Sequence, residues 1–219
     1  MEKKFTVVLF LCFSILSFAQ APAYYDAIQA FKNQDSIQMP EANSILFIGS
    51  SSFTKWTDIQ NYFPSYPIIN RGFGGSTLSD VIRYEDDIII PYHPKQIVIY
   101  CGENDLVYDS TVTGKTVFTR FKKLYTDIRT KLGNLPLIYI SMKPSPARWY
   151  LKEKELDGNN RIKKFLLKKN SNAKFIDVWP AMLGADGKPL PDIFIEDNLH
   201  MNAKGYHIWQ QLIEPHLLK

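Results

Sequence analysis

Five short apolar runs, separated by amphipathic segments, constrain the fold of this 219-residue chain more than any other feature. The runs are too short for helices and are rich in β-branched and aromatic residues, which is typical of buried strands. Because strands that alternate with helices pair in parallel, the sequence predicts an α/β fold in which helices cover both faces of a five-stranded parallel sheet. The runs are residues 45–48, 68–69, 97–100, 137–140 and 175–176.

The amino-terminal residues have the pattern of an export signal. Lys3 and Lys4 precede an apolar run over residues 5–18, and small residues follow it at the position where a signal peptidase cleaves. We expect a cleaved signal peptide over residues 1–19, a single domain over residues 20–219, and a secreted or periplasmic protein. The run is short for a bilayer, so no stable membrane insertion is expected after cleavage.

Composition argues against several classes of partner. The formal net charge of +4 is mild, and no basic run with interleaved aromatic residues suggests nucleic-acid binding. The basic stretch 161–169 has apolar residues at helical spacing and is interpreted as a solvated helix face. The loop 72–77 lacks the motifs of nucleotide-binding loops, and His93, His207 and His216 lack the spacing of metal ligands. We therefore expect no metal and no cofactor.

Polar residues follow the predicted strands at the edge where their carboxyl ends meet, which is where ligands bind in open α/β sheets. Ser51 follows the first run, Gly75 the second and Asn104 the third, and Asp197 and His200 precede the last predicted helix. Each residue also has an ordinary interpretation, because serine, glycine and asparagine are common in turns. Only their combination at one edge favours a functional site.

The combined residues are those that acyl transfer requires. A serine hydroxyl becomes an effective nucleophile when a histidine accepts its proton and an acid orients that histidine. Ser51, His200 and Asp197 are the candidates for these roles, because Asp197 is three residues from His200 and can reach one ring nitrogen while the other faces Ser51. The backbone N–H groups of Ser51 and Gly75 and the side-chain amide of Asn104 are candidate donors for an oxyanion hole.

These motifs, taken in order, resemble the four blocks of the SGNH hydrolases, also called GDSL-type esterases and lipases. The blocks are Gly49-Ser50-Ser51, the glycines that end at Gly75, Gly102 to Asp105, and Asp197 to His200. The resemblance implies a flavodoxin-like three-layer α/β/α sandwich, one SGNH-hydrolase-like catalytic domain over residues 20–219, and ester hydrolysis without a metal.

Ser50 stands where this family usually has an aspartate. A serine can still accept a backbone hydrogen bond, so the departure puts the rigidity of the turn in doubt more than the activity. The variant looks closest to the branch resembling platelet-activating-factor acetylhydrolase subunits and bacterial carbohydrate acetylesterases.

We therefore expect a secreted serine esterase that removes a small acyl group, acetyl, from a carbohydrate. The alternatives are a lysophospholipase or thioesterase of the same family, which needs an apolar trough beside Ser51, and an inactive carbohydrate-binding protein on the same scaffold. Arg148 and Trp149 follow the fourth run at the same edge, where they either touch substrate or pack the loop down. The sequence carries no signal for an oligomeric state.

Overall fold

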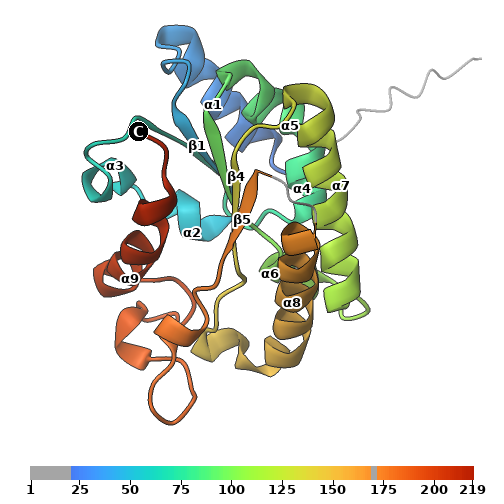
Figure 1. The fold of residues 1–219 in the computed structure, drawn as a ribbon, viewed down its shortest axis with the longest axis vertical. Helices are drawn as coiled ribbons and strands as arrows, with labels where there is room; N and C mark the ends of the chain where they lie inside the picture. The colour runs from blue at the N-terminus through green and yellow to red at the C-terminus, as the bar shows by residue number, and fades with distance from the viewer. Residues whose placement is uncertain (1–20, 169–171) are drawn as a thin grey trace, which may run out of the picture.

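The computed structural model describes residues 21–168 and 172–219, and it contains the expected sheet (Figure 1). All neighbouring strands pair in parallel, in the order β2-β1-β3-β4-β5. The α/β fold with five parallel strands is therefore confirmed. The strands are β1 (Ile45–Gly49), β2 (Ile68–Gly72), β3 (Gln96–Tyr100), β4 (Leu137–Ile140) and β5 (Ala173–Ile176).

Helices cover both faces of the sheet (Figure 1). One face carries α1 (Tyr25–Ile37), α4 (Leu78–Arg83), α5 (Glu85–Ile88), α7 (Gly114–Leu132) and α8 (Lys152–Lys168). The other carries α2 (Ser51–Thr54), α3 (Ile59–Tyr62) and α9 (Ala203–Ile213), and the short α6 (Glu103–Tyr108) follows β3. The described residues also contain five short 3₁₀ helices, at Ile90–Tyr92, Pro146–Leu151, Pro180–Met182, Pro191–Ile193 and Glu214–His216.

Strand residues alternate between two hydrophobic cores, one on each side of the sheet. In β1, Leu46 and Ile48 pack with α1, α4, α7 and α8, whereas Ile45 and Phe47 pack with α2, α3 and α9. Every residue of β1 and of β3 is buried. The continuous apolar character of the runs thus reflects strands that are covered on both faces.

Several helix boundaries differ from the sequence pattern. The amphipathic pattern of residues 24–31 predicts a short first helix, but α1 continues to Ile37. A glycine inside a helical pattern favours a break, but α8 continues through Gly158. This glycine packs on Gly114 of α7, where a Cβ would lie 2.5 Å from the Gly158 nitrogen. The final helix begins as expected, with the Asn202 side chain accepting hydrogen bonds from the N–H groups of its first turn.

The predicted signal peptide lies outside the described residues and remains a prediction. None of the helices that the structure describes is long and apolar enough to span a bilayer.

The strand order reverses between β1 and β3, because the chain moves from β1 to one neighbour, β2, and then returns past β1 to β3. Such a switch point opens a crevice at the carboxyl ends of the two strands. Gly49 makes the turn there possible, since its φ is 139° and a Cβ would lie 1.9 Å from the carbonyl oxygen of Tyr100. Ser51 and Asn104 follow the two strands that flank this crevice.

Candidate active site

Ser51 begins α2, one residue beyond the turn that ends β1. The turn is fixed by the N–H of Ser50, which donates to the carbonyl of Tyr100 on β3 at 3.1 Å. This arrangement places the Ser51 hydroxyl at the carboxyl edge of the sheet, half-buried, where a substrate can reach it.

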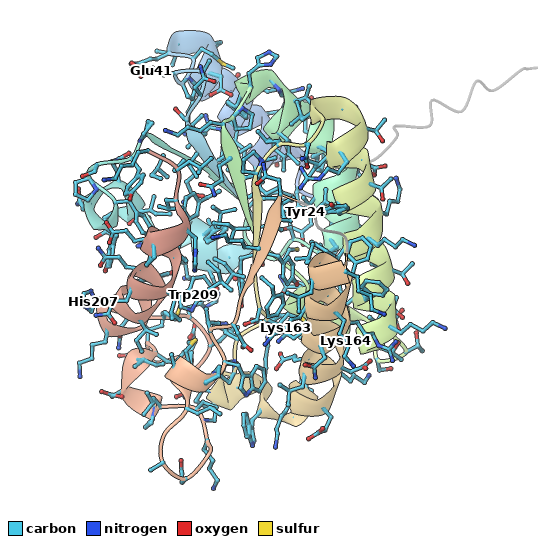
Figure 2. The ribbon with its side chains drawn as sticks, in the orientation of Figure 1. Tyr24, Glu41, Lys163, Lys164, His207 and Trp209 are labelled. Carbon is cyan, nitrogen blue, oxygen red and sulfur yellow. The ribbon has the colours of Figure 1, made fainter. Side chains whose placement is uncertain are left out.

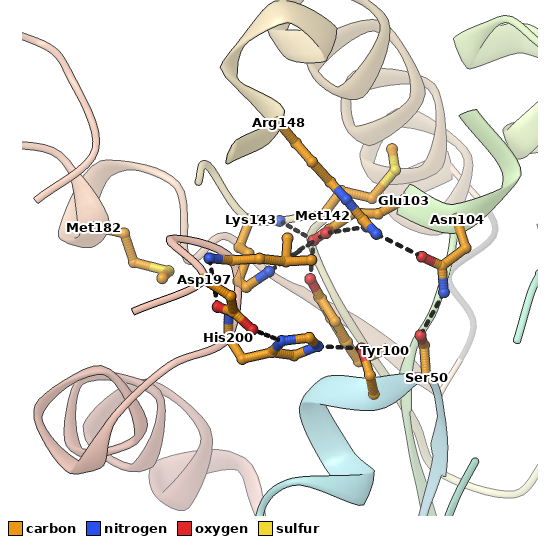
Figure 3. Close-up of polar contacts among 12 residues, drawn as sticks. Ser50, Tyr100, Glu103, Asn104, Met142, Lys143, Arg148, Met182, Asp197 and His200 are labelled. Atoms are coloured by element: carbon orange, nitrogen blue, oxygen red, sulfur yellow. Dashed lines mark hydrogen bonds and ion pairs between the residues drawn. The ribbon is translucent and has the colours of Figure 1, made fainter. Parts of the chain in front are cut away.

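A short loop before α9 holds Asp197 and His200. One carboxylate oxygen of Asp197 accepts the backbone N–H groups of Leu199 and His200, at 2.9 and 2.8 Å. The other lies 2.5 Å from Nδ1 of His200, and Nε2 of the same ring lies 2.9 Å from Oγ of Ser51 (Figure 3). The structure thus brings together the three side chains that the sequence analysis selected.

Electrostatics favour one tautomer of His200. Burial works against the charged carboxylate, but hydrogen bonds from the His200 ring and from two backbone N–H groups lower the pKa of Asp197 to about 2. An ionised carboxylate can only accept, so Nδ1 of His200 carries a hydrogen. Nε2 is then left to accept the hydrogen of the Ser51 hydroxyl.

Two backbone donors at the crevice are unengaged. Among the described residues, neither the N–H of Ser51 nor that of Gly75 donates to another group of the protein. Gly75 has a φ of 84°, and its carbonyl accepts the Tyr24 hydroxyl at 2.8 Å. Both N–H groups are therefore available to a ligand oxygen.

Asn104 is bound more tightly than the sequence analysis anticipated. Its Nδ2 donates to Oγ of Ser50 at 2.7 Å and to the carbonyl of Ser76 at 3.0 Å. Both amide hydrogens are thus engaged, and a substrate oxygen must share or replace one of these contacts. The expectation for Ser50 needs correction, because its hydroxyl accepts a side-chain amide and makes no cap hydrogen bond to the backbone.

Arg148 and Trp149 both make contacts within the protein. The Arg148 guanidinium donates to Oε2 of Glu103 at 3.0 Å and to Oδ1 of Asn104 at 2.9 Å. The Trp149 ring stacks on Trp179, with centroids 6.2 Å apart. Of the two interpretations left open by the sequence, these contacts are those of side chains that pack the loop down.

A buried ionisable cluster, consisting of Tyr100, Glu103, Lys143, Arg148 and Glu155, lies behind Asn104. The Glu103 carboxylate accepts from the Tyr100 hydroxyl and lies 3.3 Å from Nζ of Lys143. Glu155 is buried and has no hydrogen-bond partner among the described residues, and its burial, together with the charge of Glu103, raises its pKa to about 9. Sequence analysis missed Glu103, Lys143 and Glu155, although the position of Glu103 directly before Asn104 was a signal.

No group of histidine, cysteine, aspartate and glutamate residues within 21–168 and 172–219 is arranged to hold a metal ion. His207 lies on the exposed face of α9, away from the crevice (Figure 2). Cys101 is fully buried, and burial raises the pKa of its thiol, so it is a core residue and not a reactive one.

The sequence profile of the GDSL-like Lipase/Acylhydrolase family matches residues 44–208 of this chain. No curated protein matches this chain. Solved structures share its fold at low identity. A protein from Streptococcus pneumonia named for platelet activating factor has a TM-score of 0.76 and 19% identity, covering 88% of this chain and 92% of its own. A GDSL-like lipase from Bacteroides thetaiotaomicron has a TM-score of 0.72 and 20% identity. The match covers 86% of this chain and 95% of the lipase. An acetyl-xylooligosaccharide esterase from Geobacillus Stearmophilus has a TM-score of 0.61 and 15% identity. The match covers 80% of this chain and 94% of the esterase.

Proposed function

The chain belongs to the GDSL-like lipase/acylhydrolase family, a family of carboxylic ester hydrolases, and we propose that it removes a small acyl group, acetyl, from a carbohydrate. One observation carries the chemistry of this proposal. Ser51, His200 and Asp197 form a continuous hydrogen-bonded chain that ends at a half-buried hydroxyl on the carboxyl edge of the sheet. The same geometry argues against an inactive binding protein, because binding alone needs no such chain.

In the first half of the reaction, Nε2 of His200 accepts the proton of the Ser51 hydroxyl while Oγ attacks the ester carbonyl carbon. Asp197 remains ionised and stabilises the imidazolium. Negative charge develops on the carbonyl oxygen, where the N–H groups of Ser51 and Gly75 and the amide of Asn104 donate to it. Collapse of this intermediate breaks the ester bond, and the leaving alcohol takes the proton from His200.

The second half returns Ser51 to its starting state. Water gives a proton to His200 and attacks the acyl carbon of the acyl-enzyme. The same donors stabilise the second oxyanion, and its collapse releases the carboxylic acid as the proton returns to Oγ of Ser51. Apart from the ester and water, each step uses only groups of this site.

Two features support a small acyl group. A Cβ at Gly75 would lie 3.1 and 3.2 Å from the hydroxyl oxygens of Tyr108 and Tyr24, so polar groups restrict the Gly75 side of the crevice. The two described cavities with the most apolar linings lie along α8, one beside β5 and the other against Phe118 of α7. Neither is lined by Ser51, as the apolar trough of a lysophospholipase or thioesterase would be.

Support for a carbohydrate as the alcohol comes from two directions. A protein of the same fold acts, by its description, on acetyl-xylooligosaccharides. In this chain, Trp149 stacks on Trp179, and the backbone N–H of Ala147 bonds to Asn198 in the His200 loop. A half-buried aromatic ring therefore lies on a segment attached to the candidate catalytic loop, and the exposed part of such a ring offers apolar surface for sugar C–H groups.

The substrate class is tested with purified mature protein and the Ser51→Ala variant. We expect hydrolysis of p-nitrophenyl acetate to exceed that of the butyrate and octanoate esters, and release of acetate from acetylated xylooligosaccharides. A preference for octanoate would favour the lipid alternative. Turnover of no ester by the wild type would support the inactive binding protein.

The proposal also includes export of the protein from the cytoplasm, which is inferred from the signal-peptide pattern of residues 1–19. Expression of the full chain in a bacterial host should yield mature protein outside the cytoplasm, with an amino terminus near residue 20. Retention of Lys3 and Lys4 in the purified protein would contradict export by signal cleavage.

A further inference from the structure

Arg148 contacts the oxygen end of the Asn104 amide, opposite the nitrogen that contacts Ser50 (Figure 3). Its Nη2 donates to Oδ1 of Asn104 at 2.9 Å, while Nη1 donates to Oε2 of Glu103 at 3.0 Å. A guanidinium can only donate, so the atom of the Asn104 amide that faces it must be the oxygen. The amide nitrogen is thereby turned toward Ser50 and the crevice.

This orientation matters because an asparagine amide has two nearly equivalent positions that exchange nitrogen and oxygen. In the reversed position, Oδ1 would face a developing oxyanion and repel it. The Ser50 hydroxyl does not select a position, because it can donate as well as accept. The Ser76 carbonyl and Arg148 do select one, and Arg148 is the only charged group of the described chain bonded to this amide.

Arg148 is itself fixed by its buried partner. The Glu103 carboxylate also accepts from the Tyr100 hydroxyl and from the backbone N–H of Lys143, the latter at 3.2 Å. The side chain of Glu103 is 7% exposed and that of Arg148 is 15% exposed. A guanidinium that bridges an amide oxygen and a carboxylate with several other partners has little freedom to move.

The charges around Arg148 do not cancel. Lys143 and Arg148 are two cations beside the single Glu103 carboxylate. Glu155, the second acid of the cluster, is neutral near pH 7, because burial and the charge of Glu103 raise its pKa to about 9. A net positive charge therefore lies behind the Asn104 oxygen, where it polarises the amide and strengthens the N–H as a donor.

We propose that Arg148 is a positioning residue, which holds the Asn104 amide with its nitrogen toward the oxyanion and makes no contact with substrate. The assignment rests on the proposed esterase function. It replaces the substrate-contact role that the position of Arg148 at the strand ends suggested. Glu103 is the fixed point of the arrangement, because it links Arg148 to β3 and to the loop after β4.

A double-mutant cycle between Arg148→Met and Asn104→Ala tests the proposal, because two residues that act through one contact are not additive. With p-nitrophenyl acetate, we expect Arg148→Met to lower kcat roughly 10- to 100-fold, less than the loss of an oxyanion donor itself, and to change KM little. In the Asn104→Ala background, the same substitution should lower kcat less than about threefold.

Arg120→Met is the matched control. Arg120 donates to Oδ1 of Asp105 at 2.7 Å, so it forms an ion pair with the residue next to Asn104 but does not contact Asn104 itself. We expect this variant to lose thermal stability while its kcat stays within about threefold of the wild type. Equal losses of kcat in Arg120→Met and Arg148→Met would show a general loosening of α6 and overturn the proposal.

The remaining outcomes of the cycle also have defined meanings. Additive losses of kcat in the cycle, or a loss confined to KM, would mean that Arg148 touches substrate and would overturn the proposal. Unchanged kcat in Arg148→Met would also overturn it. If Arg148→Met fails to fold, the same cycle with Arg148→Lys decides, since lysine keeps the charge but cannot span both partners. Failure of the proposed function is distinguishable, because then the wild type itself would hydrolyse no ester.

Discussion

The two halves of the candidate site are built differently. Asp197 and His200 lie on a loop where the Asp197 side chain is 42% exposed, and its hydrogen bonds are all to residues two or three positions away. Asn104 is 3% exposed, and its side-chain partners are 28 to 54 residues away in the sequence. The acid that orients the base is accessible and held by near neighbours, whereas the amide that stabilises charge is buried and held by distant segments.

This difference has a physical reason. A proton-transferring histidine must meet substrate and water, so it is placed on an accessible loop and needs only one strong orienting contact. An oxyanion donor is effective because it is oriented toward the developing negative charge before the reaction begins. Any freedom of motion of the donor therefore reduces its stabilisation of that charge. Each of the following substitutions disrupts one half of the candidate site. They are given in order from the largest expected effect to the smallest.

Loss of the general base should have the largest effect. We expect His200→Ala to lower kcat/KM for p-nitrophenyl acetate by about 10³-fold or more, because the Ser51 hydroxyl then has no proton acceptor. Thermal stability should change little, since residues 195–198 of the loop are exposed and the Asp197 carboxylate keeps its backbone hydrogen bonds. Substantial residual turnover in a folded His200→Ala protein would mean that another group is the base.

Loss of the buried donor should lower both activity and stability. We expect Asn104→Ala to reduce kcat by about 10²- to 10³-fold. Unlike His200→Ala, it should also lower the melting temperature, because Ser76 and Arg148 each lose a buried hydrogen-bond partner. A melting temperature equal to that of the wild type would contradict the contrast between the two halves.

The pH dependence of stability should identify Glu155. Its pKa is raised to about 9 in the folded protein, so between about pH 4.5 and 9 the folded chain holds a proton that the unfolded chain releases. Stability contributed by this group is therefore lost as pH rises through that window. We expect Glu155→Gln to raise the free energy of unfolding more at pH 8 than at pH 5, by about 1.4 kcal/mol for each pH unit inside that window.

Chemical denaturation of both proteins at the two pH values measures this difference. A gain that is the same at pH 5 and pH 8 would mean that Glu155 is ionised in the folded protein and that the charge behind Asn104 is balanced.

The smallest effect is expected at Ser50. Replacing it with alanine removes one acceptor of the Asn104 amide but leaves Ser76 and Arg148, so kcat should fall only a few-fold. Steady-state kinetics beside Asn104→Ala give the comparison. A loss as large as that of Asn104→Ala would make Ser50, and not Arg148, the group that fixes the amide.

The same contrast explains what the sequence could predict. The strands and the Asp197–His200 loop depend on apolar periodicity and on contacts between near neighbours, and both are readable along the chain. The turn at Gly49 was readable from its residue types, although the contact with Tyr100 that requires the glycine joins distant segments. Neither the extension of α1 to Ile37 nor the continuity of α8 at Gly158 was readable. The latter depends on close packing against Gly114, a contact between distant segments.

The buried half of the site was only partly predictable. Asn104 was selected by its place after β3, but the ionic cluster that surrounds it joins α6, the loop after β4 and α8. Lys143 and Glu155 carry no local pattern that separates them from solvent-exposed charges. Their burial follows from the tertiary arrangement of these three segments, which the order of residues alone does not reveal.

The central claim is that Ser51 is an activated nucleophile, and covalent labelling tests it most directly. Wild-type protein and Ser51→Ala are incubated with a fluorophosphonate, and the adduct is located by peptide mass spectrometry. We expect one adduct, on the peptide that contains Ser51, and none in the variant. No adduct on the wild type, or an adduct that persists in Ser51→Ala, would contradict the account.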